Sequence, residues 1–307
     1  MHTTISLSIW LLVAGALAFF IVPFAWEADI AWAEESLAFC LMVSGAFMGW
    51  WGTRPGKLHS LYLQDNAGPG LIKAAVWISF FWIAFTLFFF GADRITLLWY
   101  WYYLLIGLGC VYVFGIYGTR WLGFEPRRHA YLNNNTGAGL VIAAFMLSTG
   151  LIYGGSVWGE SEPESFEAFA GPFESLPSYE EGGWIIALFF LLGWIILFLV
   201  MKIWFLRNGD LKRRILRGYS LDSAKAASLY CLGCAIPLTS AVAGDYHGLG
   251  DSLIGFSAIA LPVLAGEIVR PLTASSVEAP RQPWLYLATG IAAAIASPIA
   301  STLLGFR

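Results

Sequence analysis

Two lysines stand near the start of long apolar segments, where a charged side chain is unusual. Lys73 lies just inside an apolar run that begins at residue 71, and Lys225 directly precedes a run that begins at residue 226. An ammonium group near hydrocarbon is costly unless it extends to the membrane surface. Two readings stay open. The lysines extend to the interface, or they join helix N-termini, whose dipoles favour anions, in binding lipid phosphate or another anionic ligand.

One carboxylate also lies within an apolar run. Glu267 falls near the end of residues 253–269, and Arg270 follows three positions later, which is the spacing of a local ion pair on a helix. Carboxylates inside membrane segments also mark pathways for ions or protons. Glu267 is therefore an ion-pathway candidate, with the local pair as the alternative.

The remaining reactive side chains predict no metal centre and no active site. Asp245, His247 and Asp251 have a spacing that metal ligands can adopt, but a solvated Gly-rich turn explains them as well. Cys231 and Cys234 lie inside an apolar run, a setting that fits neither a zinc site nor a redox motif, so we interpret them as packing residues. We expect no catalytic residue, metal or cofactor. Enzyme activity stays open, with a non-enzyme favoured.

The composition explains why the elements around these residues must be membrane helices. Hydrophobic residues make up 58% of the 307 residues and charged residues only 12%, whereas soluble domains carry roughly 25% charged residues. So few charges cannot cover a surface that faces water. A nucleic-acid partner is excluded because the sequence has no basic aromatic surface and no binding motif.

Nine apolar stretches are long enough to cross roughly 30 Å of hydrocarbon. They predict an all-α integral membrane protein with spans at residues 5–25, 36–52, 71–91, 97–119, 137–158, 184–206, 226–243, 253–269 and 285–304. Basic residues follow the second, fourth and sixth spans and lie between the last two, whereas the alternate loops are acidic or neutral. The positive-inside rule then places the N-terminus in the cytoplasm and the C-terminus outside.

An internal repeat is visible in the polar joints between spans. The joint at residues 61–71 aligns without a gap with that at 130–140, so that Asn66 falls on Asn135, and Gly68 and Gly70 fall on Gly137 and Gly139. A weaker third copy covers residues 216–227 and contains Asp222. The joint before the last span has lost the pattern. These joints predict parallel repeats of a two-helix unit, because units of two spans share one orientation.

The joints have two open interpretations. Asn, Asp and Ser cap helix starts, and small residues just after a cap let helices approach closely, so the four glycines are helix-packing candidates. Alternatively, Asn66, Asn135 and Asp222 join the two lysines as candidates for binding a ligand or lipid. The predicted organisation is an extra N-terminal helix with its outer loop (1–33), a first pair of two-helix repeats (34–158), an acidic external loop (159–182) and a second pair (183–307).

The asparagine-rich joint and the helix after it resemble a known family. The run Asn133 to Gly139, and the stretch from Ala226 to Ser240, are similar to the YjfL-like inner-membrane proteins, a family called domain of unknown function 350. The resemblance covers roughly residues 36–304 and implies that this chain is a tandem duplication with an extra first helix. It implies a bacterial inner membrane and supplies no catalytic residues.

Three functions remain open on the sequence alone. The first is a membrane scaffold or complex subunit, which binds lipids and a membrane-protein partner or a second copy of the chain. The second is a channel or transporter for ions or small solutes, although transporters usually bury more ionisable residues. The third is an enzyme acting on lipid-linked substrates, which requires a polar cluster that the sequence does not offer.

Overall fold

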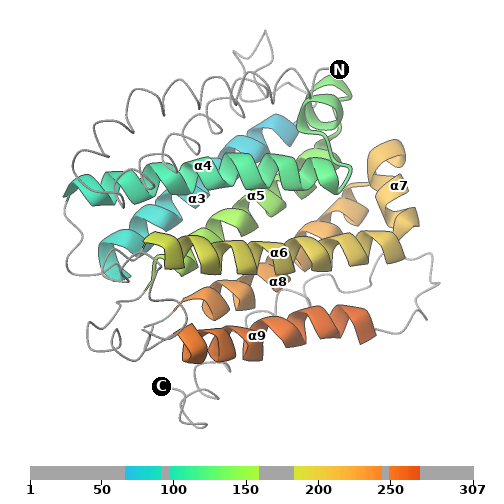
Figure 1. Ribbon diagram of the computed structural model, residues 1–307. Helices are drawn as coiled ribbons and strands as arrows, with labels where there is room; N and C mark the ends of the chain where they lie inside the picture. Colours follow the sequence, from blue (N-terminus) through green and yellow to red (C-terminus); the bar gives the residue numbers. More distant parts are fainter. Residues whose placement is uncertain (1–65, 91–96, 159–182, 244–248, 270–307) are drawn as a thin grey trace, which may run out of the picture.

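The computed structural model describes residues 66–90, 97–158, 183–243 and 249–269, and the elements in them are helices. Two short segments, the π-helical η1 (Pro126–Leu132) and α7 (Gly209–Gly218), join longer helices at one end of the bundle (Figure 1). The long helices are α3 (Gly68–Phe90), α4 (Leu97–Trp121), α5 (Thr136–Ser156), α6 (Gly183–Arg207), α8 (Leu221–Val242) and α9 (Leu249–Val269).

Five of these helices are long and apolar enough to cross a membrane, namely α3, α4, α5, α6 and α8, while α9 contains a shorter apolar stretch. The chain is therefore a multi-pass helical membrane protein. Each of the four predicted spans from 71–91 to 184–206 begins and ends within three residues of the bounds of its helix, α3 to α6 in order. The predictions at 5–25, 36–52 and 285–304 lie outside the described residues, so the total of nine stays a prediction.

The start of α8 is the largest difference from the predicted boundaries. The apolar run begins at residue 226, but the helix begins at Leu221. The first turn of α8 is polar, so the hydropathy of the sequence does not indicate it. The Ser220 side chain stabilises this turn by accepting a hydrogen bond from the backbone N–H of Ser223.

The bundle has two layers. α5 packs between α3 and α8, and α4 and α6 lie across these three helices (Figure 1). α9 packs against α6 and α8. α5 is buried along most of its length, and its small residues allow this. Gly150 lies against Ser79 of α3, and Gly155 lies against the Thr239 carbonyl of α8. A helix with larger side chains on both faces would not fit between its neighbours at this distance.

Candidate functional site

The candidate site is the end of the bundle where α3, α5 and α8 begin and where η1 and α7 lie. At the start of α5, the Asn135 side-chain oxygen accepts a hydrogen bond from Ala138 N–H at 2.9 Å. Asn134, just before it, has left-handed backbone geometry with φ of 51°. The backbone N–H of Asn135 donates to the His129 carbonyl, six residues earlier, at 3.1 Å. These three features turn the chain from η1 into α5.

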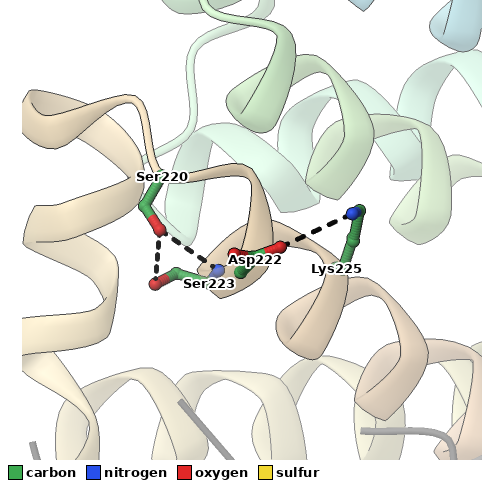
Figure 2. Close-up of polar contacts among 4 residues, drawn as sticks. All are labelled: Ser220, Asp222, Ser223 and Lys225. Atoms are coloured by element: carbon green, nitrogen blue, oxygen red, sulfur yellow. Dashed lines mark hydrogen bonds and ion pairs between the residues drawn. The ribbon is translucent and has the colours of Figure 1, made fainter. Parts of the chain in front are cut away.

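The start of α8 has the same three features at matched positions. Ser220 caps the helix through its hydroxyl, as Figure 2 shows. Tyr219, just before the cap, is left-handed with φ of 52°. The backbone N–H of Ser220 donates to the Arg214 carbonyl, again six residues earlier, at 3.1 Å. The two elbows therefore share one backbone design although Asn and Ser occupy their caps.

Side-chain amides link each elbow to the next. The Asn66 amide nitrogen donates to the Ala130 carbonyl at 2.7 Å. The Asn135 amide nitrogen donates to the Ile215 carbonyl, also at 2.7 Å. Ala130 lies five residues before Asn135, and Ile215 lies five residues before Ser220. Both links thus join an asparagine just before a helix to the same position in the following elbow.

The glycines repeat the same relation between neighbouring helices. Gly68 lies two residues after Asn66 and packs on Gly139, where an added Cβ would lie 2.4 Å from Gly68 Cα. Gly137 lies two residues after Asn135 and packs on Ala224, with an added Cβ 3.2 Å from the Ala224 Cβ. Gly70 is half-buried. Close backbone approach at these positions sets the spacing of α3, α5 and α8.

The two linking asparagines are buried within this network. Asn66 is 2% exposed and Asn135 is 0% exposed. The Asn66 oxygen accepts from the Gly68 N–H at 2.9 Å and from the Thr136 hydroxyl at 3.1 Å. Because these polar atoms bond to the protein itself, the geometry favours the structural interpretation of the asparagines over ligand binding.

The predicted ligand-binding lysines lie on separate helices, with α5 between α3 and α8 (Figure 1). Lys73 is half-exposed on α3. Lys225 is exposed on α8 and pairs with Asp222, 3.5 Å away in the same helix (Figure 2). An exposed pair of this kind contributes little stability and leaves both side chains accessible to a ligand.

Positive charge gathers at the elbow end. Among the described residues, every lysine and arginine lies there: Lys73, Arg120, Arg127, Arg128, Lys202, Arg207, Lys212, Arg213, Arg214, Arg217 and Lys225. The described acids at the same end are Glu125, Asp210, Asp222 and Glu267. Arg213 pairs with Asp210 along α7. The excess of positive charge gives this face an affinity for anions.

The surroundings of His129 in η1 favour its neutral form. Its Nδ1 accepts a hydrogen bond from the Glu125 backbone N–H at 2.9 Å, so this nitrogen carries no proton. Burial lowers the pKa of His129, and the nearby charges of Arg128 and Lys212 lower it further, while Glu125 opposes them. The imidazole therefore acts as a structural acceptor at the elbow.

Glu267 has a partner that its local sequence does not indicate. The carboxylate is buried, with 3% exposure, and accepts a hydrogen bond of 2.6 Å from the Tyr230 hydroxyl of α8. The Tyr230 ring stacks on Trp204 of α6, with centroids 4.9 Å apart. Arg270, the partner expected from spacing, lies outside the described residues. The contact to Tyr230 joins α8 to α9.

Arg207 adds a second link to the end of α9. Its guanidinium donates to the backbone carbonyls of Glu267 and Ile268, the latter at 2.7 Å. Arginine satisfies the unpaired carbonyls of a helix C-terminus and interacts favourably with its dipole. Neither Tyr230 nor Arg207 was among the sequence candidates, since contacts between residues 37 and 60 positions apart leave no local signal.

The remaining candidates provide no second centre. Within the described residues, no group of three or more His, Cys, Asp or Glu side chains is arranged to hold a metal ion. Cys231 is buried and lies 3.4 Å from the Ser148 hydroxyl, and Cys234 is half-buried. Asp245, His247 and the Asp251 side chain lie outside the described part of the chain.

Comparison with known proteins gives no match: no family model, curated protein or solved structure corresponds to this chain.

Proposed function

We propose that this chain is an integral inner-membrane scaffold or complex subunit that binds partner proteins or lipids at its surface. The observation that carries this proposal is the closed interior of the described helices. Most hydroxyl groups there bond to the protein rather than lining a path, although the Ser228 hydroxyl and the indole N–H groups of Trp194 and Trp204 have no hydrogen-bond partner among the described residues. Within the described helices, such an interior offers no path for a solute. We therefore place the function at the outer faces of the bundle and at its basic end.

Hydroxyl groups within the spans illustrate this closed interior. Ser79, Thr149 and Thr239 each donate to the carbonyl four residues earlier in their own helix, at 2.8–2.9 Å. The Tyr153 hydroxyl of α5 donates to the Tyr103 carbonyl of α4 at 2.9 Å. These bonds satisfy buried donors in place of water. They support a packed bundle rather than a conducting one.

The matched elbows support a parallel repeat of a two-helix unit across nine spans. Cap position, left-handed residue and amide link recur at equal offsets around Asn135 and Ser220. With the basic end in the cytoplasm, nine spans place the C-terminus outside. A reporter enzyme fused after Arg307 tests this topology. External activity is expected, and activity only in the cytoplasm would contradict it.

The resemblance of the asparagine-rich joint to the YjfL-like proteins supports a bacterial inner membrane as the location. A purification from native membranes in mild detergent, followed by mass spectrometry, tests the proposed role. A stoichiometric membrane-protein partner or a second copy of the chain is expected. A lone chain that retains only a small solute would overturn the scaffold proposal.

A channel or transporter is the second candidate, and the buried Glu267 is the observation that favours it. The Arg207 guanidinium bonds to the Glu267 carbonyl, which disfavours a further cation at this carboxylate. Proton and cation flux into liposomes, compared between wild type and Glu267→Gln, decides between the roles. Flux that is present in wild type and lost in Glu267→Gln would show a transporter and overturn the scaffold proposal. The absence of flux in both proteins would support the scaffold.

A further inference from the structure

The exposed side of α6 carries an apolar stripe that ends in a lysine. Leu191, Ile195 and Leu199 are exposed and recur every four residues, which places them on one face of the helix. Lys202, three residues after Leu199, continues that face and is half-exposed. The stripe therefore runs from hydrocarbon depth to an ammonium group at the basic end.

α4 extends this face with an aromatic side chain at the same depth. The Trp121 ring lies 5.9 Å from Phe198 and 6.3 Å from Trp194 of α6, between ring centroids. Trp121 is 60% exposed although it belongs to a membrane helix. Exposed tryptophan at the end of a span is typical of the boundary between acyl chains and headgroups. We call Trp121, Ile195, Phe198 and Leu199 the α4–α6 seam.

Two ammonium groups reach the turn that follows Trp121. Lys202 Nζ donates to the Trp121 carbonyl at 3.1 Å. Lys212 Nζ, from α7, lies 5.9 Å from the Phe124 ring centroid and over Gly123, where an added Cβ would be 2.5 Å away. Both charges thus converge on residues 121–124.

The local environment leaves these charges under-compensated. Among the described residues, the Lys212 ammonium makes no hydrogen bond and no ion pair; its contact is with the Phe124 ring. Burial lowers the pKa of Lys212, and the charge of Lys202 lowers it further. The acid on this turn, Glu125, interacts with His129. An ammonium has three donors, so Lys202 also keeps donors beyond its bond to Trp121.

We propose that an anionic phospholipid binds at the α4–α6 seam, with its phosphate held by Lys202 and Lys212 and an acyl chain lying along the apolar stripe. This inference rests on the lipid-binding part of the proposed function and names the ligand class and its site. The apolar stripe distinguishes a lipid from a soluble phosphoester. Only a lipid has both a phosphate for the two lysines and an acyl chain for the stripe. The site is separate from Lys73 and Lys225, which lie on α3 and α8.

Native mass spectrometry of the delipidated full chain tests the site. The chain is titrated with phosphatidylglycerol, with phosphatidylcholine of the same acyl chains, and with glycerol phosphate as the headgroup alone. Preferential retention of phosphatidylglycerol is expected, and Lys202→Gln/Lys212→Gln should weaken it about 20-fold, since each basic residue near an anionic lipid contributes several-fold. Lys202→Arg/Lys212→Arg should restore most of the binding.

A matched control removes the same charge from the same end of the molecule. Lys73→Gln/Lys225→Gln should keep the wild-type preference. Equal loss in both double variants would mean that only net charge matters, and this would overturn the site. If glycerol phosphate competed as strongly as the lipid, the ligand of this site would be a soluble phosphoester rather than a phospholipid. Protein partners counted in the same spectra report on the scaffold separately, so either proposal can fail alone. Unchanged thermal unfolding of each variant excludes misfolding as the cause of a loss.

Discussion

Replacing Asn135 tests whether one side chain both caps α5 and ties it to the next elbow. In Asn135→Ala, the Ala138 N–H loses its acceptor, which costs about 1 kcal/mol as an N-cap. The Ile215 carbonyl loses its donor, and an unsatisfied buried group costs about 1–3 kcal/mol. The expected loss in the free energy of unfolding is therefore about 2–4 kcal/mol.

Asn135→Ser separates the two contributions. Serine occupies the matched cap of α8, so it should keep the cap and lose only the link to Ile215, at a cost of about 1–3 kcal/mol. Asn133, which is exposed in the same elbow, provides the control, because Asn133→Ala should change stability by no more than about 0.5 kcal/mol.

Unfolding in mixed micelles titrated with sodium dodecyl sulfate, followed by tryptophan fluorescence, gives these free energies. The order of stability should be wild type, then Asn135→Ser, then Asn135→Ala. If Asn135→Ala matched Asn133→Ala, or if Asn135→Ser were the less stable of the two Asn135 variants, the argument from the elbow contacts would be refuted.

Three further perturbations follow from other contacts. Gly139→Val should destabilise by about 1–3 kcal/mol through overpacking, because a Cβ meets α3 backbone; Gly209→Val, in open space, is the control in the same thermal unfolding assay. Tyr230→Phe removes the donor to Glu267 and should cost about 1.5–3 kcal/mol, whereas equal melting temperatures would argue against this contact. Because the pKa of His129 is lowered on folding, its contribution is complete above the ordinary value of 6.5 and is lost as the pH falls through and below it. Amide exchange in η1 should therefore accelerate on acidification, and a pH response that persists in His129→Gln would exclude this histidine.

The membrane helices could be predicted from the sequence because their signal is local. Long apolar runs predict α3 to α6 closely, and the asparagine of the repeated joint predicts the cap of α5. The elbow helices η1 and α7 were expected only as polar joints. α7 is a short helix rich in basic residues, and its buried Ile215 packs in the core of the bundle. Such short helices depend on tertiary contacts rather than on propensity.

The contacts that build the site were not accessible from local patterns. The Asn135 amide reaches Ile215, 80 residues further along the chain. Lys202 and Lys212 belong to different helices and meet only because both reach the turn after Trp121. One signal for this seam was present, since Lys202 follows the last exposed apolar position on α6, Leu199, by three residues and so lies on the same helix face. This spacing indicates a site only once the structure shows that these positions are exposed.

The mass of the native particle tests the proposed scaffold role most directly. The chain would be extracted from its own membrane into nanodiscs without detergent exchange, and single particles would be weighed. The account predicts a mass above that of one chain with its lipid, corresponding to a stoichiometric partner or a second copy. A particle with the mass of a single chain, together with solute flux after reconstitution, would contradict it.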